Sequence, residues 1–165
     1  MTDIALVWDN DAFSADLAFA EGALTLDDGC RTAILISLFS DARASDDADL
    51  PQQGDDRRGW WGDQFAEDAD ADAGSASDEN RIGSLLWLLR RAKVTNANIR
   101  LARQSCEDAL AWFVRDGIAS AVTVEVEAQE IEPGRRRLAL GVTLDRPNGP
   151  DRQRYDFVWE ASVSS

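Results

Sequence analysis

Carboxylates dominate the reactive side chains of this sequence. Its 165 residues include 31 Asp and Glu against 17 Lys and Arg, with no histidine, for a formal net charge of −14. Without histidine the chain has no imidazole base, no Ser-His-Asp triad and no histidine metal ligand. Hydrolysis by two carboxyl groups needs them on either side of a cleft, and one of them must have a raised pKa. Carboxylates are too frequent for the sequence to single out such a pair, so we predict no catalytic residue and no enzyme activity.

One acidic tract has the spacing of a calcium-binding loop. Asp68, Asp70 and Asp72 alternate with other residues, and Glu79 is the twelfth residue counted from Asp68. Such a loop needs glycine where this chain has Ala73, however, and no predicted helix leads into the tract. The tract also lacks large apolar groups whose burial would offset its ordering entropy. We therefore predict a flexible, solvated acidic loop at about residues 66–79 and no metal ion.

Neither the cysteines nor the glycines form a cofactor motif. Cys30 and Cys106 lack the CxxC spacing of a zinc site, so we predict two buried free thiols. Gly59 and Gly62 bracket two tryptophans and do not open a helix, as a phosphate-binding loop requires. The sequence thus predicts no cofactor and no small-molecule substrate.

The most unusual segment runs from Asp55 to Asp63 and contains Arg57, Arg58, Trp60 and Trp61. Two adjacent tryptophans between glycines stand there in polar surroundings. They can anchor a long loop onto the core, or they can form a protein–protein hot spot, since Trp and Arg dominate such sites. Adjacent side chains rarely point the same way, so one tryptophan can face inward and the other outward. The sequence leaves both interpretations open.

The negative charge is concentrated in one quarter of the chain. Residues 41–80 hold 13 acids and 3 bases, a net charge of −10. The overall balance disfavours nucleic acid and anionic membranes as partners, because both attract a basic surface. The start has no basic leader, and no apolar run reaches about 18 residues. We expect a soluble protein made in a cytoplasm, with no nucleic-acid or membrane partner.

Three helices are predicted before the last third of the chain. An apolar run over residues 30–39, with Asp27 or Asp28 as its N-cap, predicts a largely enclosed helix. Closely spaced leucines predict a second helix over residues 82–89, followed by basic residues that complement its dipole. Apolar residues at three- and four-residue steps predict a third helix over about residues 98–115.

The hydrophobic period changes to two in the last third. Apolar and polar residues alternate over residues 122–128, 138–144 and 155–159, with turn signals between the runs, and a short alternation at Leu24–Leu26 precedes the helices. Three strands with one apolar face each form an antiparallel meander, which amphipathic helices can cover. We predict one α+β domain over residues 1–165, with N-terminal helices packed on a C-terminal three-stranded antiparallel meander.

Four pieces of the chain resemble the Mu-like phage baseplate protein family. They are Leu26–Gly29 with Thr32-Ala33, Ile36–Asp41 with Arg43-Ala44, Asp56–Asp63, and Arg81–Leu89. The Arg-Gly-Trp-Trp-Gly-Asp block is their most specific part, and the resemblance covers roughly residues 3–160. The acidic tract at Glu67–Glu79 departs from the family's pattern, in which that stretch is short.

The resemblance implies a small baseplate wedge component of a contractile phage tail, similar to the small wedge protein of T4-like baseplates. Such a protein is located in the virion and joins the wedge to the central tube and sheath region. The implied partners are a larger wedge protein, the sheath protein and other tail or baseplate subunits. In that family picture it offers strand pairing to the first sheath ring, and an edge strand is a template for an added strand. The partner-interface candidates are Arg57, Arg58, Trp60, Trp61, Leu140, Val142, Tyr155, Phe157 and Trp159.

Two other functions stay open on the sequence alone. One is a tail-associated cell-wall hydrolase that uses carboxylates, which would lyse peptidoglycan and lose that activity on a single carboxylate substitution. The other is a non-phage acidic interaction module, whose gene would lack neighbours encoding a spike, a larger wedge protein and a sheath.

Overall fold

The computed structural model describes residues 3–27, 29–60, 82–133, 135–147 and 152–159. The predicted acidic loop at about 66–79, the calcium-like spacing within it and Trp61 lie outside these residues, as does the alternative N-cap Asp28.

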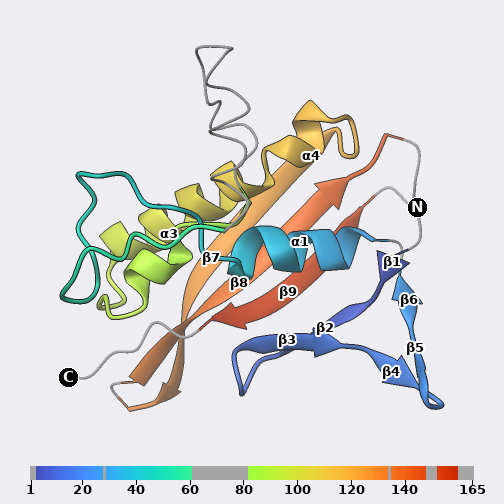
Figure 1. Cartoon of the computed structure of the whole chain (residues 1–165), viewed down its shortest axis with the longest axis horizontal. Coiled ribbons are helices and arrows are strands. Elements are labelled where there is room, and N and C mark those ends of the chain that lie inside the picture. Colours follow the sequence, from blue (N-terminus) through green and yellow to red (C-terminus); the bar gives the residue numbers. More distant parts are fainter. Residues whose placement is uncertain (1–2, 28, 61–81, 134, 148–151, 160–165) are drawn as a thin grey trace.

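The predicted meander is present in the last third of the chain. Strands β7 (Ala121–Glu132), β8 (Arg135–Asp145) and β9 (Gln153–Trp159) form an antiparallel sheet in the order β7-β8-β9. Helices α1 (Cys30–Phe39) and α3 (Asn96–Leu110) lie across the same face of this sheet (Figure 1). The α+β prediction, with helices packed on a C-terminal meander, is therefore confirmed.

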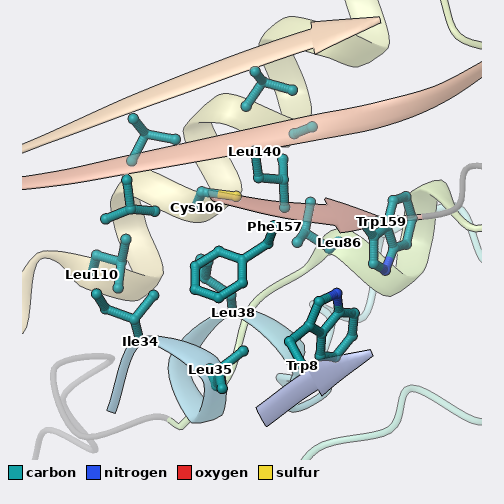
Figure 2. Packing of buried hydrophobic residues seen from close by; sticks show 14 of the residues in the cluster. Trp8, Ile34, Leu35, Leu38, Leu86, Cys106, Leu110, Leu140, Phe157 and Trp159 are labelled. Atoms are coloured by element: carbon teal, nitrogen blue, oxygen red, sulfur yellow. The ribbon is translucent and has the colours of Figure 1, made fainter. Parts of the chain in front are cut away.

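Alternate residues along β8, β9 and the first half of β7 enter one core. The register places Val126 opposite Leu140, and Leu140 opposite Phe157, so a row of buried side chains crosses the sheet. From the helix side, Cys106 and Leu110 of α3 meet this row, as Figure 2 shows together with residues of α1. Burial of these side chains stabilises the fold by roughly 25 cal/mol for each Å² of apolar surface removed from water.

The helices differ from the prediction in three places. The second predicted helix, over 82–89, is reduced to the 3-10 turn η2 (Leu86–Leu89), because the backbone of Ser84 pairs with the chain around residues 40–42 instead of starting a helix. The third divides into α3, which begins after its N-cap Thr95, and a short helix α4 (Trp112–Arg115). Asp27 does not cap α1, since its Oδ1 accepts a hydrogen bond from the Gly29 amide at 2.6 Å, one residue before the helix.

Six short strands precede α1, of which the sequence indicated only the alternation at Leu24–Leu26. They pair as three antiparallel arms, listed here by their strands: β1 (Asp3–Ile4) with β6 (Leu26–Asp27), β2 (Leu6–Asp9) with β3 (Ser14–Leu17), and β4 (Phe19–Ala20) with β5 (Ala23–Leu24). The arms meet at Ala5, Ala18 and Thr25, whose backbone groups form a closed ring of three hydrogen bonds of 2.9 Å each. We call this arrangement the three-way junction (Figure 1).

The three-way junction is fixed to the rest of the fold from the β2–β3 arm. The Trp8 ring stacks on Phe39 of α1 at 3.8 Å between centroids, and its Nε1 donates to the Val158 carbonyl at 3.0 Å. The Val158 amide donates to Oδ1 of Asn10, also at 3.0 Å. Both outward-facing backbone groups of β9 at Val158 are thus occupied by side chains of this arm.

The strand order corrects one expectation. Leu140 and Val142 lie on β8, which is the central strand, and their side chains are 1% and 0% exposed. They belong to the core and present no edge to a partner, because both sides of β8 are already paired. In a three-stranded meander the middle strand has a neighbour on each side, so the assembly edge expected at residues 138–144 does not exist.

We expect both thiols to be unreactive in the folded protein. Cys30 and Cys106 are buried free cysteines, and burial raises the pKa of the Cys106 thiol to about 12. At pH 8 a thiol reagent should label neither residue until denaturant unfolds the chain. Because the folded pKa exceeds the unfolded value, this contribution to stability is complete below about pH 9 and declines as the pH rises towards 12. Thermal unfolding scans from pH 8 to pH 11 measure this loss of stability. A Cys106→Ala variant should lack the portion of the loss that comes from ionisation of the thiol. Rapid labelling of the native protein would contradict the expectation.

Candidate functional site

Arg57 fastens the loop that follows α1. Its guanidinium donates to the carbonyls of Ser45 and Asp46 and, at 3.4 Å, to that of Ala48. Its own carbonyl accepts from the Ala44 amide at 3.0 Å. Arg57 therefore closes the loop between residues 44 and 57, through its own carbonyl at Ala44 and through its guanidinium at the carbonyls of the first half of the loop.

Arg58 connects the same loop to the core. Its guanidinium pairs with Asp41 and lies 4.8 Å from the centre of the Trp87 ring. Trp87 is 2% exposed, and its Nε1 donates to the Ala42 carbonyl at 2.8 Å. A cation over an indole adds roughly 0.5–1 kcal/mol where solvent still reaches it.

The segment before η2 completes this arrangement. The Ser84 amide donates to Ser40 at 2.9 Å, and its hydroxyl donates to the Leu38 carbonyl at 2.5 Å. Gly83 has φ +104°, and a Cβ there would lie 2.5 Å from the Ser40 carbonyl oxygen. We call the cluster of Asp41, Arg58, Ser84 and Trp87 the loop anchor. Of the two interpretations of the Arg57–Trp61 segment, the loop anchor supports the anchoring role for its two arginines.

The predicted tryptophans and last strand have mixed surroundings. Trp60 is exposed at the point where the described loop ends. Phe157 and Trp159 face the core, while Tyr155 is partly buried and donates its hydroxyl to Gln153 at 2.8 Å. The hot-spot role of the tryptophans stays a prediction.

A hollow of about 300 Å³ lies where the loop anchor, the β2–β3 arm and the end of β9 meet. Trp8, Phe39, Trp87 and Trp159 line it, together with Asp41. Figure 2 shows the indoles of Trp8 and Trp159 next to each other at this end of the core. The structure thus brings one predicted interface residue, Trp159, to the same hollow as the loop anchor. The N-terminal contribution was missed, although Trp8 in a short alternating run was a usable signal.

The opposite face of the sheet carries a charged row. Arg154 donates to Glu125 at 2.6 Å and to Asp156 at 2.8 Å, and these carboxylates raise the pKa of its guanidinium. The guanidinium crosses the sheet over Gly141, where a Cβ would lie 2.5 Å from its Nη2. The row links the three strands on their solvent side; such exposed pairs each contribute only about 0–1 kcal/mol.

The described residues offer little to metal or acid–base chemistry. Within them, no three His, Cys, Asp or Glu side chains converge in a group that could hold a metal ion. Backbone hydrogen bonds from Ala12 and Asp11 lower the pKa of Asp9, and a hydrogen bond with the Ser45 side chain lowers that of Asp47, whereas a general acid needs a raised pKa. No helix in the described parts of the chain is long and apolar enough to cross a membrane.

Comparison with known proteins shows that this amino-acid sequence is similar to phage proteins. Residues 30–151 match the family model described as "Phage protein GP46". The chain is 38% identical over 164 residues to "Baseplate protein gp46" of Escherichia phage Mu, which covers 99% of both chains. It is 34% identical over 154 residues to "Mu-like prophage FluMu protein gp46" of Haemophilus influenzae, which covers 93% of this chain and 94% of the relative.

We expect Gly83→Ala to destabilise the fold through the loop anchor. Gly117 is a matched control, since it also has a positive φ, +72°, but nothing lies within 4 Å of its would-be Cβ. The backbone strain of alanine should cost about 1–2 kcal/mol at Gly117, and the clash with Ser40 should add about 1–3 kcal/mol at Gly83. Chemical denaturation of both variants measures the difference, and equal losses would show that the loop anchor tolerates the extra atom.

Proposed function

The chain belongs to the gp46 family of Mu-like phage baseplate proteins, and we propose that this baseplate structural protein joins the wedge to the central tube and sheath region. Its location is the tail baseplate of the virion, and its partners are other baseplate subunits. The finer assignment, to a larger wedge protein on one side and the sheath protein on the other, is our proposal.

The observation that carries this proposal is the outer edge of β7. Among the described residues, β7 pairs on one side only, with β8. At the other edge of the sheet, Trp8 and Asn10 occupy the backbone groups of Val158. β7 is also the longest strand, with 12 residues, and its half from Glu127 onward is exposed. An unpaired edge of this length can accept a strand from another chain.

The side chains of β7 indicate what kind of strand it accepts. The strand contains Glu125, Glu127, Glu130 and Glu132 and no Lys or Arg, while Glu125 pairs with Arg154 and the register places Arg136 and Arg135 of β8 opposite Glu130 and Glu132. Like charges disfavour the pairing of two β7 edges from two copies, which is how natural edge strands avoid self-association. We propose that a strand of the sheath protein with basic side chains adds to this edge and so positions the first sheath ring.

A pair of adjacent proline substitutions tests the edge. Backbone amides alternate between β8 and the outer side, so one of Glu127→Pro and Ala128→Pro removes a ladder hydrogen bond and the other removes only an outward donor. Thermal unfolding identifies the second variant as the more stable of the two. We expect that variant to support baseplate formation but to reduce sheath assembly on purified baseplates by at least tenfold, as counted by electron microscopy. Normal sheath assembly with it would exclude pairing at β7.

The segment around Trp60, at the end of the described loop, is our proposed contact with the larger wedge protein. Trp60 is 42% exposed there, and large aromatics dominate protein interfaces. We expect Trp60→Ala, alone and together with Trp61→Ala, to weaken co-purification with that protein. Leu85→Ala, at a side chain that is 38% exposed, is the control. If the Trp60 variants fold and still co-purify normally, Trp60 does not contact the larger wedge protein, and only the anchoring role of the segment is left.

A further inference from the structure

The residues around the three-way junction follow one pattern. Each of the three junction residues, Ala5, Ala18 and Thr25, is small and is flanked on both sides by large apolar residues. The flanking residues are Ile4, Leu6, Leu17, Phe19, Leu24 and Leu26. We call these six side chains the junction face.

Strand pairing groups the six side chains in twos around the junction. Ile4 is paired with Leu26, Leu6 with Leu17, and Phe19 with Leu24, and directly paired residues point to the same face of an antiparallel ladder. Ala5, Ala18 and Thr25 lie outside the strands, and their closed ring of hydrogen bonds brings the three pairs together. The junction face is therefore made of three apolar pairs, one at the inner end of each arm.

Most of this surface is exposed. Only Leu6 packs against the core, while the other five side chains are exposed by the following fractions: Ile4 40%, Leu17 45%, Phe19 65%, Leu24 43% and Leu26 64%. Through Leu6 the face continues into the hollow beside α1, which is also lined by Ile36, itself 43% exposed. Contiguous exposed apolar patches of this kind mark interaction surfaces in soluble proteins.

The charge of the same segment restricts the partner. Residues 1–29 contain no Lys or Arg, and their acids are Asp3, Asp9, Asp11, Asp16, Glu21, Asp27 and Asp28. Three of these acids, Asp3, Asp16 and Asp27, directly adjoin residues of the junction face in the sequence, and charges this near to a surface are only partly screened by salt. Their field opposes an acidic surface, including a second copy of this chain, and favours a basic one.

We propose that the junction face binds a protein surface with an apolar centre flanked by Lys and Arg, on another subunit of the baseplate. The inference rests on the proposed function for the identity of the assembly, but the face itself lies outside residues 30–151 that the family model matches. It is separate from the β7 edge, so the protein holds two neighbours by two kinds of contact.

A matched pair of substitutions tests the junction face. Leu26→Asp introduces a charge at a side chain that is 64% exposed, and Leu101→Asp makes the same change on α3 at one that is 57% exposed. Each variant is expressed as the full chain in a phage that lacks the wild-type gene. Two quantities are measured: the amount of the variant in purified baseplates and the thermal stability of the variant itself. We expect the amount of Leu26→Asp in baseplates to be at least tenfold lower than that of wild type, and the amount of Leu101→Asp to remain within twofold of it.

A labelling measurement keeps the inference testable if Leu26→Asp does not fold. Both native cysteines are buried, so a maleimide reports on Cys introduced at Phe19. Phe19→Cys should react readily in the purified protein and at least tenfold more slowly in assembled baseplates. Leu101→Cys, outside the junction face, is the reference and should react at a similar rate in both states. Equal reaction of Phe19→Cys in both states, or normal incorporation of folded Leu26→Asp, would overturn the inference. A dimer of the purified protein that Leu26→Asp dissociates would assign the face to a second copy instead. Absence of the wild-type chain from baseplates would contradict the proposed function itself.

Discussion

The position of the Trp8 indole connects the parts of this molecule. It stacks on Phe39 of α1 and donates a hydrogen bond to Val158 on the outer edge of β9. This contact fixes the three-way junction beside the sheet and, together with Asn10, occupies the outward backbone groups of β9 at Val158. The other edge, along β7, has no strand partner among the described residues, and we propose it as the place where another chain extends the sheet. The direction of the junction face follows from the same contact, because Leu6 and Trp8 are on the same side of β2.

The residues that carry the family resemblance have a structural role in the loop anchor. Asp41, Arg58 and Ser84 come from three separate pieces of the resemblance, and they meet around Trp87. The anchor combines an ion pair, a cation–π contact and backbone pairing that leaves no space for a Cβ at Gly83. A family signature of this kind specifies a loop conformation, which suits a protein that functions by fitting between neighbours.

The elements that the sequence predicted are those with a long regular pattern. The three- and four-residue steps at 98–115 and the alternation in β7, β8 and β9 each repeat often enough to identify a period, and the run at 30–39 was recognised by its length and apolar composition. The arms of the junction are strands of two to four residues, so their alternation is too short to distinguish from chance. The helix predicted at 82–89 failed for a different reason, since the Ser84 amide found a tertiary partner in Ser40.

The sequence by itself determined the fold class, the apolar face of each strand and the absence of histidine-dependent chemistry, because composition and period act locally. It located much of the acidic charge in residues 41–80, but the apolar residues of the acidic N-terminus gave no sign of being exposed. Only the tertiary structure decided that side chains of the β2–β3 arm hydrogen-bond to β9 at Val158 and that most of the junction face is exposed. These depend on which distant backbone groups hydrogen-bond to one another, and a local pattern carries no information about that choice.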